Sequence, residues 1–163
     1  MTAITRSQPD KQSEIRVVLG LGCDRGAAAT TIEEAINHAL QQIALTTNQV
    51  VAVASIDKKS DEVGLLTICK KHGWHCTWYS AAELAEVEVP NPSAVVQKYV
   101  GTPSVGEAAA ILRAGATKES LLIEKYRYRG ECGRNATVAI CILKSDSIAT
   151  NAATDPLTKQ ASK

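Results

Sequence analysis

The sequence of 163 residues contains no phenylalanine, and aromatic residues make up only 4% of it. Apolar residues nevertheless reach 45%, so the core must be built from the aliphatic side chains of Val, Ile, Leu and Ala. A strong charge of either sign is also absent. The formal net charge is +1, which argues against nucleic acid or an anionic membrane as a partner of the whole molecule. Length and composition together indicate one globular domain.

Long apolar runs are missing as well. No segment is long and apolar enough to span a bilayer, and the polar residues 1–13 lack the apolar region of a signal peptide. We therefore expect a cytoplasmic protein with no membrane partner. The cysteines are odd in number and irregularly spaced, which is typical of free thiols in a reducing compartment. They are Cys23, Cys69, Cys76, Cys132 and Cys141.

Apolar runs and helix-start signals alternate along the chain. The runs predict strands over residues 14–19, 50–56, 74–79, 120–128 and 137–143. Helices are expected between them, over about 30–45, 61–72, a short stretch from 81, 93–100 and 104–113. Capping boxes are expected at Thr30 or Thr31, at Ser80 and at Ser104.

This order of elements predicts a three-layer α/β/α fold with a mixed, mostly parallel sheet of about five strands. The first strands should be parallel because helices separate them, and the last two can form an antiparallel hairpin. Residues 14–144 are predicted to form the single domain. Residues 1–13 and 145–163 are predicted to be disordered, because they are polar and show no apolar period.

The segment GLGCDRG, residues 20–26, follows the first predicted strand and precedes a helix. Its glycines let the backbone approach a ligand, the helix start favours an anion, and Arg25 offers a guanidinium to a carboxylate or phosphate. The same pattern is also that of a simple strand-to-helix turn. It resembles the dinucleotide fingerprint with the third glycine one residue late, so a nucleotide-binding Rossmann-like domain is the alternative, with Asp57 at the ribose position.

Cysteines occur in two patterns that could carry chemistry. Cys23 lies near a helix start and Arg25, which favour a thiolate, but no histidine is near it in sequence. We interpret it as a turn residue. Cys69, His72, His75 and Cys76 are spaced like metal ligands, yet His75 and Cys76 should point to opposite faces of a strand. We therefore predict no metal site and no cofactor.

Charged residues follow the strands at two places. Asp57 and Lys59 come directly after strand 50–56 and are candidates for ligand contacts, whereas Asp61 and Glu62 fit the first turn of a helix. Lys125 is the first of three cations that alternate with tyrosines in residues 125–129. Such a stripe suits a polycarboxylate ligand, and it is equally typical of a protected edge strand.

Several segments taken together resemble the CobE / CbiG C-terminal domain family of cobalamin biosynthesis. They are GLGCDRG (20–26), SIDKKSDEVGL (55–65), VPNPS (89–93), VGTPSVGEAAA (100–110) and ATVAI (136–140). The resemblance covers about residues 15–143. It implies a three-layer α/β fold and a role in the corrin-ring pathway. CbiG-type proteins are implied to open the δ-lactone of cobalt-precorrin 5A and release acetaldehyde. Because the usual N-terminal domain is not in this sequence, the stand-alone CobE form is the expectation.

The resemblance also implies which residues bind the ligand. These are Gly22, Cys23, Arg25, Gly26, Asp57, Lys59, Asn91, Ser93, Gly101, Thr102, Ser104 and, on the late strand, Lys125. The expected partner is a corrinoid or precorrin intermediate, whose rim of acetates and propionates suits N–H groups and cations; other enzymes of the pathway are further expected partners. Asp57 and Glu107 are the candidates for activating water in a hydrolase. A carrier without chemistry of its own is the other corrinoid reading.

Overall fold

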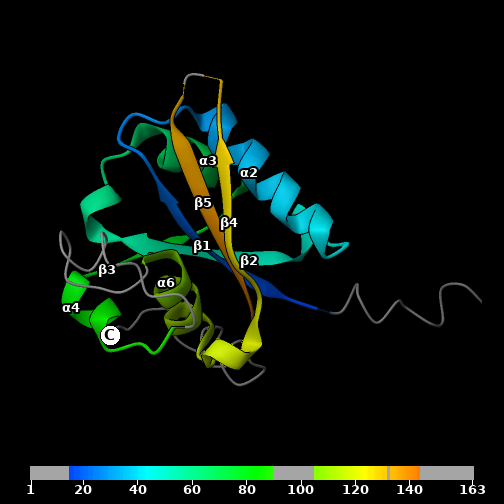
Figure 1. Ribbon diagram of the computed structural model, residues 1–163, viewed down its shortest axis with the longest axis vertical. Coiled ribbons are helices and arrows are strands. Elements are labelled where there is room, and N and C mark those ends of the chain that lie inside the picture. Colours follow the sequence, from blue (N-terminus) through cyan, green and yellow to red (C-terminus); the bar gives the residue numbers. More distant parts are fainter. Residues whose placement is uncertain (1–14, 90–104, 132, 144–163) are drawn as a thin grey trace, which may run out of the picture.

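The computed structural model describes residues 15–89, 105–131 and 133–143. A five-stranded sheet with the order β3-β2-β1-β5-β4 has helices on both faces (Figure 1). The strands are β1 (Val17–Cys23), β2 (Val50–Ile56), β3 (Cys76–Tyr79), β4 (Leu121–Arg129) and β5 (Asn135–Ile142). The helices are α2 (Ala29–Gln42), α3 (Val63–His72), α4 (Ala81–Ala85) and α6 (Val105–Ala114), with short 3₁₀ turns η2 (Thr47–Gln49), η3 (Asp57–Lys59) and η4 (Lys118–Ser120). This arrangement confirms the predicted fold class.

The sheet is mixed in the predicted way. Strands β1, β2 and β3 are parallel neighbours, whereas β5 runs antiparallel to both β1 and β4. The β-branched run of β2 occupies the predicted residues, and its side chains are buried except that of Val51. The last two strands form the predicted antiparallel hairpin. Strand β1 lies at the centre, so residues that follow it come between the two halves of the sheet.

Two aliphatic cores flank the sheet. One lies under α2 and α3 and contains Leu19, Leu21, Ile32, Ile36, Val53 and Ile140. The other lies under α4 and α6 and contains Val18, Ala52, Ala54, Leu84, Ile111 and Cys141. Because alternate residues of a strand face opposite sides of the sheet, β1 serves both cores. The core is aliphatic, as the absence of phenylalanine predicts.

Strand β1 extends further than predicted. Residues 20–23 continue the strand, so the expected loop is reduced to residues 24–28 and the prediction for its first half is wrong. The glycine at position 20 has a packing reason: a Cβ added there would collide with the carbonyl oxygen of Gly106 and meet the Cβ of Ala110. Helix α6 therefore packs directly on the backbone of β1.

The helix ends confirm some of the predicted caps and correct others. Ser80 and Glu83 form the predicted capping box, with their reciprocal hydrogen bonds at 3.1 and 2.8 Å. The predicted box at Thr30 or Thr31 is wrong, because α2 begins after Ala28 and has no side-chain cap. Helix α3 begins two residues later than predicted and ends at Gly73, whose φ of 72° is left-handed.

Several predictions fall on residues 1–14, 90–104, 132 and 144–163 and lie outside the described residues. They are the two ends predicted to be disordered, the helix over 93–100, the cap at Ser104 and the candidate ligand-binding residues Asn91, Ser93, Gly101, Thr102 and Ser104. Within the described part of the chain, no helix is long and apolar enough to cross a bilayer.

The contact between β1 and α6 predicts a large effect of one methyl group. Gly20→Ala should lower the free energy of unfolding by about 3 kcal/mol, because the new Cβ meets backbone that cannot rotate away. Gly73→Ala is the control: it has open space but a left-handed φ, and should cost only about 1 kcal/mol. Urea unfolding of both variants measures the difference. Equal losses would contradict the packing explanation.

Candidate functional site

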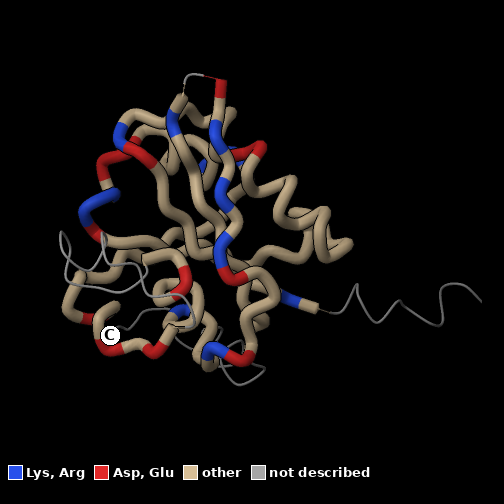
Figure 2. Tube along the Cα trace, viewed as in Figure 1, with Lys and Arg blue, Asp and Glu red and all other residues tan. Residues whose placement is uncertain are grey.

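The candidate site lies where the parallel strands end. The carboxyl ends of β1, β2 and β3 share one edge of the sheet, and the β4–β5 turn reaches the same edge because Cys23 and Tyr128 both pair with Ala136. Ligands of open α/β sheets bind at this edge. Figure 2 shows charged residues of both signs after β1, after β2 and at the end of the hairpin. The edge thus unites the two segments that the sequence predicts to bind a ligand.

Arg25 connects the segment after β1 to the segment after β2. Its guanidinium donates to Asp61 Oδ1 at 2.7 Å and to the carbonyl oxygen of Lys58 at 2.9 Å, and Nη1 lies 2.7 Å from Glu62 Oε2. The pairing lowers the pKa of the Asp61 carboxyl and raises that of Arg25. Arg25 was predicted to offer its guanidinium to a ligand. The structure shows that the guanidinium is already occupied by internal partners.

Glu62 is the buried member of this group. Its side chain is only 4% exposed, and Oε1 accepts a hydrogen bond from the backbone N–H of Gly26 at 3.1 Å. Oε2 makes an ion pair with Arg25 without hydrogen-bond alignment, so charge alone compensates it. Glu62 is the N-cap residue of α3, whereas the sequence predicts it in the first turn of the helix, and it connects the loops after β1 and β2. In the sequence, the only indication of this role is that Glu62 follows β2, the strand expected to lie beside β1.

A cavity of about 540 Å³ opens beside this group, between the starts of α2 and α3. It is lined by Arg25, Gly26, residues 27–29, residues 61–64 and Thr67. Gly64 permits the close approach of the two helices, since a Cβ there would lie 2.5 Å from the carbonyl oxygen of Ala27. The first turn of α2 carries neither a side-chain cap nor an acidic residue. Its N–H groups are suited to an anion.

The β4–β5 turn adds residues that the sequence analysis missed. Asp24 Oδ2 accepts hydrogen bonds from the backbone and side-chain nitrogens of Asn135, at 2.7 and 3.2 Å. Arg134 lies over Gly26, with Nε 3.6 Å from the position of an added Cβ. Gly26 itself has a φ of 82°, which favours glycine. Sequence gives no indication that residues 134 and 135 meet residues 24–26, because this contact depends on the sheet order.

Cys23 ends β1 as a half-buried thiol. Burial raises its pKa to about 11, against a smaller opposing effect of the Lys59 charge. The thiol is therefore protonated at neutral pH and is a poor nucleophile. The raised pKa agrees with the expectation that Cys23 is not a nucleophile, but Cys23 is the last residue of strand β1 and not a turn residue. The effect of the Lys59 charge indicates that Lys59 lies near the end of β1. As a thiol, Cys23 can still make a weak polar contact with a ligand.

The two candidate carboxylates have different surroundings. Asp57 is exposed at the end of β2, in the turn η3, where its carbonyl accepts from the N–H of Ser60 at 3.0 Å. Glu107 is fully buried in the first turn of α6, on the opposite face of the sheet from α2 and α3. Of the pair, Asp57 is the one that bulk water reaches.

Lys125 does not join this edge. It lies in the middle of β4, at the outer side of the sheet, where the pairing register shifts between Ile123 and Tyr126. Lys125 therefore lies apart from the segments that follow β1 and β2, and its contact with a ligand stays a prediction. Among the three alternating cations, Arg127 and Arg129 follow the shift, and they approach the edge because they pair with Thr137 and Asn135.

The Cys69–Cys76 segment connects α3 to β3. The ring of His72 stacks on that of Trp74, with centroids 4.2 Å apart, and its Nε2 lies 3.1 Å from Glu33 Oε2. His72 thus has structural partners. Cys69 is buried. Among the described residues, no group of three or more His, Cys, Asp or Glu side chains is placed to hold a metal ion.

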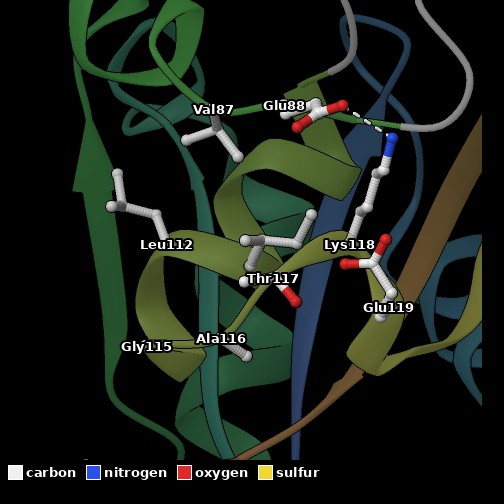
Figure 3. Close-up of a pocket in the computed structure, with 9 residues that line it drawn as sticks. Val87, Glu88, Leu112, Gly115, Ala116, Thr117, Lys118 and Glu119 are labelled. Carbon is white, nitrogen blue, oxygen red and sulfur yellow. Dashed lines mark hydrogen bonds and ion pairs between the residues drawn. The ribbon is translucent and has the colours of Figure 1, made fainter.

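A second cavity has a volume of about 340 Å³, and Figure 3 shows the residues that line it. It is formed by the end of α6 with η4 and Val87, and the Lys118–Glu88 ion pair of 2.7 Å crosses its rim. Leu121, just after η4, pairs with Cys141 and thereby lies level with Val18, near the start of β1. Of the predicted ligand-binding residues that the structure describes, none lines this cavity.

Comparison with known proteins decides the family. The model of the family described as Cobalamin synthesis G C-terminus matches residues 17–141. The chain belongs to this family. The matched residues contain β1 to β4 and β5 up to Cys141, so the candidate edge and most of both cores lie within the family domain. Membership confirms the resemblance noted in the sequence and does not favour the nucleotide-binding alternative.

Two curated proteins are similar in sequence. The chain is 34% identical over 130 residues to a cobalt-precorrin-5A hydrolase of Priestia megaterium, covering 80% of this chain and 33% of that protein. It is 34% identical over 109 residues to Protein CobE of a Sinorhizobium species, covering 66% of this chain and 70% of that protein. The chain thus spans about a third of the length of the hydrolase.

Solved structures support the fold. The crystal structure of CobE, a protein from the cobalamin biosynthetic pathway, matches with a TM-score of 0.68 at 28% identity, covering 85% of this chain and 97% of that chain. The cobalamin biosynthesis protein chiG of Agrobacterium tumefaciens matches with a TM-score of 0.55 at 28% identity, covering 80% and 99%. Both matches cover nearly the whole of the solved chains, so the fold described for this chain is that of the family.

Because Glu62 is buried and Asp61 is exposed, removing their charges should have different effects on the free energy of unfolding. Glu62→Gln should lower the free energy of unfolding by about 1–2 kcal/mol, because Arg25 loses a buried charge partner and Gly26 a strong acceptor. Asp61→Asn, at a side chain 79% exposed, should cause no measurable change. Urea denaturation midpoints compare them. A larger loss for Asp61→Asn would contradict the assignment of Glu62 as the buried connector.

The Cys23 thiol predicts a shifted pH profile of alkylation. Iodoacetamide labelling of the native protein, followed peptide by peptide by mass spectrometry, should show Cys23 reacting with a midpoint near pH 11 rather than 9.0. Because the unfolded thiol ionises first, its contribution to stability should fall as pH rises from about 9 to about 11. A midpoint at or below 9 would identify an activated thiol and contradict the burial argument.

Proposed function

We propose that this domain binds a corrinoid or precorrin intermediate of cobalamin biosynthesis at the edge where β1, β2 and β3 end. The observation that carries the proposal is that, in a member of this family, the two predicted loops after β1 and β2 meet at that edge beside a cavity of about 540 Å³. The ligand class follows from the relatives, one of which is a hydrolase of cobalt-precorrin 5A.

The chemistry of the edge suits a ring with carboxylates on its rim. Positive charge at this edge comes from Arg134, which lies over Gly26, and from Lys59, whose charge acts on Cys23 at the end of β1. The start of α2 beside them has no side-chain cap. The predicted contacts with Gly22, Cys23, Gly26, Asp57 and Lys59 belong to this proposal. In it, Arg25 acts as a positioning residue, because its partners Asp61 and Glu62 hold it in the loop. Carboxylates then bind the backbone N–H groups that Arg25 keeps in place.

Hydrolysis of a lactone on the same ligand is the second candidate function. It is favoured by the 34% identity to a protein named cobalt-precorrin-5A hydrolase, of which the chain covers 33%. Asp57, exposed at the edge, would activate water, and the N–H groups of the loop would stabilise the oxyanion. Glu107 would act only on a ligand group that reaches into the α6 face, since its side chain is fully buried.

A titration tests the binding proposal. Adding cobyrinic acid, a corrin with free peripheral carboxylates, to the pure protein should shift the visible spectrum of the ligand and make it co-elute with the protein in gel filtration. NAD and ATP at the same concentration should leave the melting temperature unchanged. Absence of both the spectral shift and co-elution would contradict corrinoid binding, and a thermal shift with nucleotide alone would restore the nucleotide-binding alternative.

Mass spectrometry of the ligand then separates carrier from enzyme. Incubation with cobalt-precorrin 5A should leave its mass unchanged if the domain only binds it. A ring-opened product accompanied by acetaldehyde would establish hydrolysis. Asp57→Asn is the matched variant for that case, because it keeps the size of the side chain and removes the base; it should abolish turnover while the spectral shift persists.

A further inference from the structure

Strand β4 presents two chemically different faces. The hydroxyl of Tyr126 lies 3.4 Å from His38 Nδ1, and the hydroxyl of Tyr128 donates to Glu34 Oε1 at 2.8 Å, so both tyrosines face α2. Residues 126–129 pair with β5 without a register shift. Because successive side chains of a strand alternate, Arg127 projects from the other face of the sheet, the one that α6 covers.

Thr137 lies beside Arg127 on that face. It pairs with Arg127 on one side and with Gly22 on the other, while Ala136 and Val138 belong to the core under α2. Side chains directly opposite in an antiparallel pair have Cβ atoms about 5 Å apart. A guanidinium and a hydroxyl therefore stand next to each other on the α6 face, at the edge of the candidate site.

Glycine at position 22 keeps this place open. A Cβ there would lie 2.7 Å from Thr137 Oγ1, so any other residue would crowd the hydroxyl. Helix α6 packs on the sheet at Gly20, one step of the alternation earlier along β1. Gly22 and Thr137 are half-buried, whereas Gly20 and Ala139, which pair with each other further from the edge on the same face, are buried.

Arg127 differs from Arg25 in one decisive respect. Arg25 has two carboxylates and a carbonyl as partners. Within residues 15–89, 105–131 and 133–143, neither the exposed guanidinium of Arg127 nor the hydroxyl of Thr137 has a hydrogen bond or ion pair. An exposed arginine next to a hydroxyl donor on a glycine-lined surface matches a carboxylate, which accepts from both.

We propose that Arg127 and Thr137 bind a peripheral carboxylate of the ligand on the α6 face of the sheet, with Gly22 as the floor of the contact. The inference rests on the proposed corrinoid binding and specifies it further. The guanidinium of Arg127 donates to the carboxylate oxygens, and the hydroxyl of Thr137 donates to one of them. A ligand held here extends across the end of β1, from the α6 face toward the loop of residues 24–28.

This assignment gives the cations of β4 separate roles. Arg129 folds over the hairpin turn, with Nη2 3.4 Å from the position of a Cβ on Gly133. Lys125 lies on the far side of the register shift, toward the middle of the edge strand. These two fit the role of charges that protect an exposed strand edge. Arg127 is the member of the stripe that borders the candidate site.

The test compares Arg127→Gln with Arg16→Gln, a matched change of an exposed arginine just before β1, at the opposite end of the sheet. Cobyrinic acid should bind Arg127→Gln at least tenfold more weakly than the parent, and Arg16→Gln as tightly as the parent. The heptamethyl ester of the same corrin carries no peripheral charge, and its affinity should not differ between the parent and Arg127→Gln. Thr137→Val, which keeps the shape and removes the hydroxyl, should weaken binding of the acid by a few-fold.

The outcomes separate the two proposals. If the parent binds the acid and Arg127→Gln binds it equally tightly, the carboxylate site is wrong while corrinoid binding stands. If the parent binds neither the acid nor the ester, corrinoid binding itself is wrong and the site falls with it. Equal loss of acid and ester affinity in Arg127→Gln would indicate altered structure and overturn the charge argument. As a control on folding, all variants are expected to have the same urea midpoint as the parent.

Discussion

The close packing of α6 on the backbone of β1 is the constraint on which the rest of the structure depends. Gly20 and Gly106 meet there without side chains between them, and a single Cβ on Gly20 would collide with the helix backbone. This contact fixes the height at which α6 covers the sheet. It buries the α6 face up to Gly20 and leaves Gly22 and Thr137 half-buried beyond it. Gly20 therefore has a packing role, and Gly22 is the glycine of β1 that adjoins the candidate site.

The charges at the carboxyl end of the sheet divide into two classes. One class is satisfied within the protein: Arg25 holds Asp61 and Glu62 and thereby joins the segment after β1 to the segment after β2. The other class faces outward, with Arg127 as the cation that adjoins the open part of β1. Arginine is suited to both uses because its planar fork pairs with carboxylates, whether these belong to the protein or to a ligand. The surrounding partners decide which use applies.

Much of the fold could be predicted from the sequence because it depends on local signals. The β-branched run of β2, the glycine end of α3 at Gly73 and the box of Ser80 with Glu83 were all correctly read. The strand boundary in GLGCDRG was misread because glycine normally marks a turn, whereas here a helix packs on it from another part of the chain. No local pattern contains that information.

The site was predictable in its location and less so in its contacts. Topology alone places the ends of parallel strands at one edge, and the resemblance to the family indicated the loops. The partners of Arg25, the contact of Arg134 with Gly26 and the pairing of Arg127 with Thr137 all join residues more than nine positions apart. Such contacts depend on sheet order and register, and Lys125 lies in the middle of β4, away from this edge.

Hydrogen exchange with and without cobyrinic acid tests the central claim most directly, because it locates the ligand on the chain. The account predicts slowed amide exchange in residues 20–28, in residues 57–64 and in the β4–β5 turn. It predicts no change at the cavity between α6 and η4, where Lys118 pairs with Glu88. Protection confined to that cavity, or protection absent from the three segments in a protein that binds the acid, would contradict it.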